Sequence, residues 1–176
     1  MHDTRSGGIG VSWQSNNIFI KKVITSNNYL DGIALYNSTN VIVSDFISKN
    51  NGAGIRLDNN LNKIVFNDGI IYNNSDVGIF VRNTSDVTFS NIVISTNGNH
   101  GAFMHHDEAN PETTGVTNIL FMGCTFQNNN GYGLQLSSPS PYSYKNAVAG
   151  SLFSDNFSGC FMFEPNSMAE SANVCF

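Results

Sequence analysis

The chain has 176 residues, enough for one domain with a buried core, so we expect a single domain over 1–176. Only 12% of the residues are charged and the formal net charge is −5, so the composition gives no electrostatic case for binding nucleic acid. No apolar run approaches the roughly 20 residues that span a bilayer, so no membrane partner is predicted.

The main pattern along the chain is a repeat that opens with glycine and an apolar residue. Successive copies lie 22 to 32 residues apart, a spacing typical of a solenoid. The copies start at Gly8-Ile9, Gly32-Ile33, Gly54-Ile55, Gly78-Ile79, Gly101-Ala102, Gly133-Leu134 and, in degenerate form, Cys160-Phe161.

The rest of each repeat has the pattern of short strands separated by turns, as in "NVIVSDFISKNN" and "DVTFSNIVISTNG". Val, Ile and Phe alternate with polar residues, which favours strands over helices. Paired asparagines precede the repeat glycine, and Asn tolerates the left-handed conformation while its amide can bond an identical neighbour. These pairs are Asn27-Asn28, Asn50-Asn51, Asn73-Asn74 and Asn128-Asn129. We therefore predict an all-β, right-handed parallel β-helix of about seven rungs with Asn-rich turns and no substantial helix.

The two ends of the solenoid differ in sequence. The first rung begins at Gly8 with little before it and no secretion signal, so we expect a truncated N-terminal end or one that docks on a further domain or subunit. Irregularly spaced phenylalanines in 157–176 predict a C-terminal cap. Cys160 and Cys175 bracket the cap as a disulfide or as free thiols, whereas Cys124 is predicted to be a small buried side chain.

Strand geometry predicts which side chains face solvent. In the glycine-led strand, Ile33 and Leu35 point inward, and the alternate positions point outward and form columns from rung to rung. One predicted outward column contains Gly10, Ala34, Arg56, Phe80, Phe103, Gln135 and Met162. The next contains Ser12, Tyr36, Asp58, Arg82, His105, Ser137 and Glu164.

Four residues of the second column are the predicted catalytic residues, on neighbouring rungs. Arg82 could pair with a sugar carboxylate, and His105 could take the proton from the adjacent carbon near neutral pH. Asp58 would orient Arg82, and Tyr36 would donate a hydrogen bond or stack on a sugar. The alternative is an ordinary surface with a cross-strand Asp58–Arg82 ion pair.

The predicted substrate-binding residues lie beside this column. Arg56 adds positive charge, Phe80 and Phe103 offer flat faces for a sugar ring, and Gln135 lies on the next rung. Insertions that follow His105 and Leu136 should form a wall beside the column, because solenoid insertions often lie on the binding face. They contribute three further predicted contacts, His106, Tyr142 and Tyr144.

The predicted site contains no metal ligand and no cofactor. A calcium ion shared between Asp45 and Asp68 is one possibility, since both occupy similar turns on neighbouring rungs. The alternative is that both are solvated turn residues.

The repeat resembles the pectin-lyase-like superfamily of right-handed β-helices, which includes pectate and alginate lyases, mannuronan C5-epimerases and phage tailspikes. The segment "GAFMHHDE" is similar to the alginate-epimerase strand Gly-Phe-Asp-Pro-His-Glu, with His105 at its histidine. Phe103 and Met104 stand where that motif has Asp and Pro, and Ser137 stands where the family has a second Asp.

The resemblance implies an enzyme that acts on an acidic, uronic-acid-containing polysaccharide as a lyase or C5-epimerase, or a fragment of one. It also implies a location outside the cell, on the cell surface or on a virion. The alternative is a non-catalytic adhesin or tailspike-type module that trimerises. Glycoside hydrolysis fits less well, because the column brings only one carboxylate, Asp58, to the site.

Overall fold

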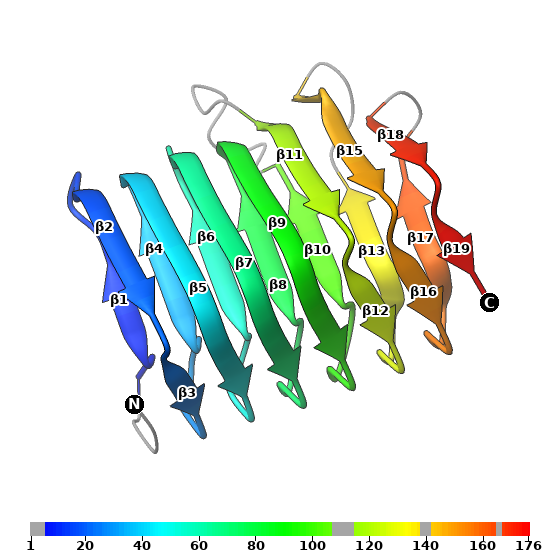
Figure 1. Cartoon of the computed structure of the whole chain (residues 1–176), viewed down its shortest axis with the longest axis horizontal. Coiled ribbons are helices and arrows are strands. Elements are labelled where there is room, and N and C mark those ends of the chain that lie inside the picture. Colours follow the sequence, from blue (N-terminus) through cyan, green and yellow to red (C-terminus); the bar gives the residue numbers. More distant parts are fainter. Residues whose placement is uncertain (1–5, 107–114, 138–141, 165–166) are drawn as a thin grey trace.

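A computed structural model describes residues 6–106, 115–137, 142–164 and 167–176 of the chain. The chain winds into a parallel β-solenoid of successive, nearly identical rungs (Figure 1). A 7-stranded sheet and a 12-stranded sheet run along its length. No helix occurs within the described ranges.

The 7-stranded sheet is formed by the glycine-led strands in the order β1-β4-β6-β8-β10-β13-β17. Neighbouring strands pair in parallel without a shift, so that Tyr36 lies opposite Asp58, Asp58 opposite Arg82, and Arg82 opposite His105. This register confirms the predicted column from Tyr36 to Ser137 and the one from Gly10 to Met162. The strands are β1 (Ile9–Val11), β4 (Ile33–Tyr36), β6 (Ile55–Asp58), β8 (Ile79–Arg82), β10 (Ala102–His105), β13 (Tyr132–Ser137) and β17 (Gly159–Phe163).

The 12-stranded sheet contains the remaining strands, and three of its strands are long. The long strands are β5 (Thr39–Lys49), β7 (Asn62–Tyr72) and β9 (Thr84–Ser95). The shorter strands are β2 (Asn16–Lys21), β3 (Ile24–Ser26), β11 (Val116–Met122), β12 (Thr125–Gln127), β14 (Ser143–Tyr144), β15 (Asn146–Ala149), β16 (Leu152–Ser154), β18 (Met168–Ser171) and β19 (Val174–Cys175).

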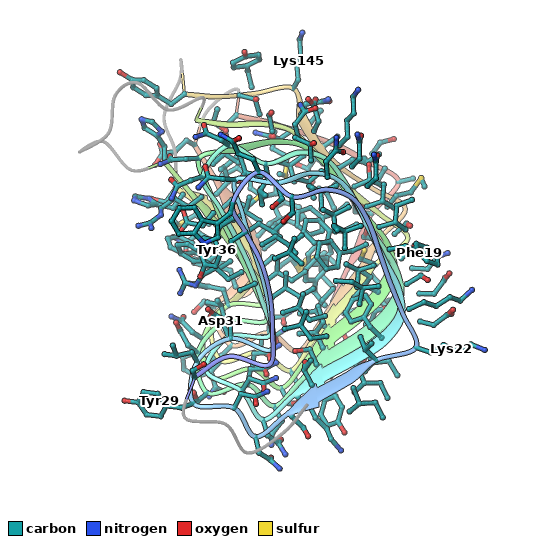
Figure 2. The ribbon with its side chains drawn as sticks, turned by 90° about the vertical axis from the view of Figure 1, so that its left-hand side faces the viewer. Phe19, Lys22, Tyr29, Asp31, Tyr36 and Lys145 are labelled. Carbon is teal, nitrogen blue, oxygen red and sulfur yellow. A yellow bond between two sulfur atoms is a disulfide. The ribbon has the colours of Figure 1, made fainter. Side chains whose placement is uncertain are left out.

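A residue with left-handed backbone lies at the same point of successive rungs in this sheet. Asp45, Asp68 and Asn91 have φ values of 53°, 55° and 53° within the long strands. On the first rung Lys22, between β2 and β3, holds the equivalent position, and Figure 2 places it at a corner of the cross-section. Asx residues and glycine suit this conformation, which explains why this corner is rich in them.

The interior is filled by stacked apolar side chains. Phe66, Phe89 and Phe121 form one stack, with ring centroids 5.4 and 4.7 Å apart, and Phe46 meets Phe66 edge to face at 5.8 Å. The inward residues predicted from the glycine-led strands, such as Leu57, are fully buried. Each such aliphatic or aromatic side chain contributes about 1.5–3 kcal/mol on burial, so the stack is a major source of stability.

The predicted asparagine ladder is confirmed, and the second residue of each pair forms its buried part. Side-chain amides donate from Asn28 to Asn51 at 2.8 Å and from Asn74 to Asn97 at 3.0 Å. The backbone N–H of Asn51 donates to the side chain of Asn74 at 2.9 Å, which completes the link. The ladder continues through Asn97, Asn129 and Asn156. The first residues of the pairs form a second, exposed ladder through Asn27, Asn50 and Asn73.

The described residues of the C-terminal segment, 157–164 and 167–176, form the last turn of the solenoid. Strands β17, β18 and β19 pair with β13, β15 and β16 of the rung before. Cys160 and Cys175 form a disulfide with a Cα–Cα distance of 6.0 Å, which settles the alternative left open by the sequence. Cys124 is a free, buried thiol, and burial raises its pKa to about 11.

The ladder leads to a test of which amide stabilises the rungs. Asn74→Ala should lower the free energy of unfolding by about 1–3 kcal/mol, because it leaves buried ladder partners without their bonds. Asn73→Gly is the matched control, since it removes only an exposed amide and suits the left-handed backbone of residue 73. Urea denaturation measures both variants. Equal stability of Asn74→Ala and the parent protein would contradict the buried ladder.

Candidate functional site

The predicted catalytic column lies on the outer face of the 7-stranded sheet. In Figure 2, Asp31 and Tyr36 lie on one side of the cross-section, whereas Phe19 and Lys22 lie on the opposite side. Four charged side chains form a continuous network on this face. Asp31 accepts from Arg56 Nε, with its two oxygens 3.2 and 3.1 Å away, and Arg56 Nη1 lies 3.9 Å from Asp58.

Asp58 and Arg82 form the tightest pair of the network. Arg82 donates from Nε and Nη2 to the two oxygens of Asp58 at 2.9 and 2.6 Å. Asp58 is only 2% exposed, whereas the Arg82 side chain is one-third exposed. Asp58 therefore fixes the direction of the Arg82 guanidinium. The pair uses two of the five donors that a guanidinium carries.

The network is balanced in charge. Two carboxylates, Asp31 and Asp58, face two guanidiniums, Arg56 and Arg82. Burial raises the pKa of Asp31, and the charge of Arg56 beside it acts in the opposite direction. Burial likewise raises the pKa of the Tyr36 hydroxyl, so Tyr36 stays protonated and can donate a hydrogen bond at neutral pH.

Phe80 and Phe103 lie next to each other on this face, with ring centroids 5.9 Å apart. The Arg56 guanidinium lies 4.5 Å from the centre of the Phe80 ring in a cation–π contact. Arg56 therefore binds Asp31 and covers Phe80 at once. Gln135 lies opposite Phe103 on β13 and extends the column by one rung.

His105 is held by the strand that follows it in the sheet. Its Nδ1 lies 3.1 Å from the backbone carbonyl oxygen of Ser137. A carbonyl oxygen only accepts, so Nδ1 carries the proton and the neutral ring keeps its lone pair on Nε2. The ring also lies nearly parallel to that of Phe103, with centroids 5.9 Å apart.

Two further residues, His100 and Asp31, join the face from the turn before the strand and were not predicted from the sequence. His100 Nδ1 accepts the backbone N–H of Tyr132 at 3.0 Å, and its ring lies 5.6 Å from that of Phe103. Burial lowers the pKa of His100, so its ring is neutral at neutral pH. Both residues stand directly before a repeat glycine. A comparison of this position among the rungs would have found them.

The structure describes all three predicted contacts from the insertions, His106, Tyr142 and Tyr144. His106 is 1% exposed, bonds Asn83 through Nδ1 at 3.1 Å and stacks on Tyr142 at 4.1 Å, so it packs inside the protein. Tyr144 is half exposed but pairs in register with Thr117 of the 12-stranded sheet. Most of both insertions, residues 107–114 and 138–141, lies outside the described residues.

The two carboxylates proposed for calcium have different partners: a lysine for Asp45 and a neutral amide for Asp68. Asp45 lies 3.4 Å from Lys21 Nζ, and Asp68 accepts from the Asn67 amide at 2.8 Å. Within the described ranges, no group of three or more His, Cys, Asp or Glu side chains could hold a metal ion.

Residues 7–175 match the family model described as a right-handed β-helix region. The chain therefore belongs to the right-handed β-helix family, which confirms the predicted fold and handedness. No curated protein sequence matches the chain. In the described part of the chain, no helix is long and apolar enough to cross a membrane.

Several solved structures share the fold at low sequence identity. A double mutant of the periplasmic alginate epimerase AlgG is 21% identical with a TM-score of 0.69, and the alignment covers 96% of this chain and 36% of that one. Tailspike protein 2 from Escherichia coli O157:H7 bacteriophage CAB120 is 15% identical with a TM-score of 0.70, over 94% and 23% of the two chains. The A-module of the Azotobacter vinelandii mannuronan C-5 epimerase AlgE6 is 16% identical with a TM-score of 0.52, over 98% and 61%. The chain thus spans less than two thirds of each.

The ion-pair network leads to a stability test. Asp58→Asn should lower the free energy of unfolding by about 1–3 kcal/mol, because it removes a buried acceptor and leaves two neighbouring guanidiniums without their shared carboxylate. Asp76→Asn, at an exposed carboxylate, is the control and should change stability by less than about 0.5 kcal/mol. Thermal and urea denaturation measure both. An Asp58→Asn variant as stable as the parent protein would show that the network contributes nothing.

Proposed function

We propose that the chain is a carbohydrate-active β-helix that acts on an acidic, uronic-acid-containing polysaccharide. The reaction begins with removal of the proton next to the sugar carboxylate, as in a lyase or a C5-epimerase. The observation that carries the proposal is the pairing of His105 with Arg82 on adjacent strands, with the His105 lone pair held on Nε2.

Arg82 is the proposed carboxylate contact. A guanidinium that binds the sugar carboxylate offsets part of its negative charge. The C–H bond on the carbon next to that carboxylate therefore becomes more acidic. Asp58 fixes the guanidinium before any substrate arrives, which lowers the entropy lost on binding. A substrate carboxylate would share Arg82 with Asp58, since the network has no surplus cation.

His105 is the proposed proton acceptor. The Ser137 carbonyl holds the ring through Nδ1–H, which sets its orientation and leaves Nε2 to receive a proton. Phe103 lies beside the ring, and Tyr36 supplies a hydroxyl three rungs away on the same column. Phe80, Phe103, Arg56 and Gln135 are the proposed sugar contacts. His106, Tyr142 and Tyr144 are not included, because His106 is buried, Tyr142 stacks on it and Tyr144 pairs with the 12-stranded sheet.

The similar structures support this proposal at the level of substrate class. Two of them are named as alginate or mannuronan epimerases. Separately, the segment "GAFMHHDE" resembles the epimerase strand in sequence, with His105 at its histidine. Phe103 replaces the aspartate of that strand, so any turnover would rely on a different set of groups. The AlgG structures are periplasmic and the tailspike is a phage protein, which supports a location outside the cytoplasm.

Two substitutions at the site should have different effects on turnover and on substrate binding. His105→Ala should lower kcat by about 10²–10⁴-fold with little change in the affinity for an anionic oligosaccharide, because it removes only the proton acceptor. Arg82→Lys keeps a cation for Asp58 but loses the bidentate geometry, so it should weaken both turnover and binding.

The assay incubates each variant with alginate, pectate and glucuronan. Absorbance detects unsaturated products, NMR detects epimerised residues, and calorimetry measures binding. Tyr29→Ala, at an exposed turn residue, is the control and should behave as the parent protein. Full turnover by His105→Ala would contradict its role as the base.

A second candidate is a non-catalytic structural module that associates with copies of itself. It is favoured by an apolar column on the outer face of the 12-stranded sheet. Ile24, Ile47, Ile70 and Val93 lie in register there, and Ile24 and Ile70 are 53% and 43% exposed. An aliphatic column that runs along the solenoid matches the same column of a second copy better than it matches a sugar.

This second candidate has its own test. If the apolar column is a self-association surface, the protein should sediment as an oligomer at micromolar concentration and Ile70→Asp should convert it to a monomer. Tyr29→Asp, at an exposed turn residue, should leave the oligomer intact. A parent protein that is monomeric at these concentrations would rule the second candidate out.

A further inference from the structure

The turn that follows β1 contains a tryptophan in an unusual setting. Trp13 is 92% exposed and has left-handed backbone, with φ at 63°. Gln14 beside it has φ at 60°, and its backbone N–H donates to the Asn37 carbonyl at 2.7 Å. The turn is therefore tied to the next rung of the solenoid, and the indole projects from it.

Asparagine occupies the left-handed positions of this turn on the following rungs. Asn37, Asn59, Asn60 and Asn83 have φ values between 44° and 59°. Asparagine adopts this conformation readily, whereas a bulky aromatic residue with positive φ is an outlier. Trp13 thus has both an unfavourable backbone and an exposed apolar ring, and neither contributes to the stability of the fold. Strained residues of this kind cluster at ligand sites.

Trp13 forms one wall of an open cleft of about 830 Å³. The cleft spans the first three rungs, and Tyr36 of the proposed catalytic column lines it as well. Amide side chains supply most of its polar groups, and none of the described lining residues is charged. The lining includes Gln14, Asn16, Asn37 and Asn60.

We propose that this cleft is a saccharide subsite in which a pyranose ring stacks on the indole of Trp13. The flat indole fits the C–H face of a sugar, and the amides can both donate to and accept from its hydroxyl groups. The absence of charge means that the subsite recognises the hydroxyl and C–H surfaces of a sugar residue and leaves its carboxylate in solvent. Binding here is therefore insensitive to salt.

The subsite extends the proposed function and rests on it. Tyr36 and His105 are three strands apart in the 7-stranded sheet, about 14 Å at the usual spacing between strands. One sugar residue of a chain spans about the distance between two neighbouring strands. A hexasaccharide bound across His105 can therefore reach Trp13, whereas a disaccharide bound at His105 cannot.

Fluorescence gives a direct readout, because Trp13 is the single tryptophan of the chain. A uronic-acid hexasaccharide should shift the emission of the parent protein to shorter wavelength in a saturable way, and a disaccharide should not. His105→Ala should retain the shift, because the subsite does not depend on the base.

Variants of Trp13 then separate binding from folding. Trp13→Gly should raise the thermal midpoint, since glycine relieves the left-handed backbone, and should weaken hexasaccharide binding about five- to tenfold by calorimetry. Disaccharide affinity should not change. Trp13→Phe should recover part of the hexasaccharide affinity. Tyr29→Ala removes another exposed aromatic ring, which does not line the cleft, and should have no effect.

The outcomes separate this inference from the proposed function. If the parent protein binds the hexasaccharide and Trp13→Gly binds it equally well, the subsite is wrong and the proposed function stands. If the parent protein binds no uronic-acid oligosaccharide by calorimetry, the proposed function fails, and the subsite fails with it.

Discussion

The structure depends on unshifted parallel pairing between successive rungs. Because each strand lies opposite the same positions of the next, inward residues stack on inward residues and outward residues form columns. The buried asparagine ladder and the phenylalanine stack stabilise this register, since both join equivalent side chains of neighbouring rungs. A shift of one residue in a strand would turn its core side chains toward solvent and its outward charged side chains, such as Arg82, into the core. The candidate site is therefore a direct consequence of the repeat.

The ion-pair network of Asp31, Arg56, Asp58 and Arg82 contributes to stability and also fixes the side chains of the proposed site. Asp58 is nearly fully buried and holds Arg82, while Asp31 holds Arg56 over Phe80. The cost of burying these charges is offset by their mutual contacts. The result is a rigid, electrically balanced surface on which His105 presents an Nε2 acceptor. This balance means that an acidic polymer would be attracted by local geometry and hydrogen bonding more than by net charge.

The fold could be predicted from the sequence because every rung repeats the same local chemistry. The glycine-apolar pairs and the asparagine pairs gave the strand positions, the register and the outward columns, including the Asp58–Arg82 contact. The features that could not be predicted from the sequence lie where a single rung departs from the repeat. His106 directly follows His105 yet is buried against Tyr142, and the side-chain positions in an insertion follow from packing that no periodicity records. His100 and Trp13 lie in turns, where the repeat is weakest, and neither was recognised as part of the site.

The central claim is that this face removes the proton next to a uronic-acid carboxylate, and isotope exchange tests it most directly. The protein would be incubated with alginate, pectate and glucuronan in D₂O, and deuterium at C5 of the sugar would be followed by NMR. Epimerisation places deuterium at C5, and elimination yields an unsaturated residue in place of that C–H. The account predicts one of these outcomes for at least one polymer with the parent protein, and neither with His105→Ala. Intact C5–H in all three polymers, or the same exchange with His105→Ala, would contradict it.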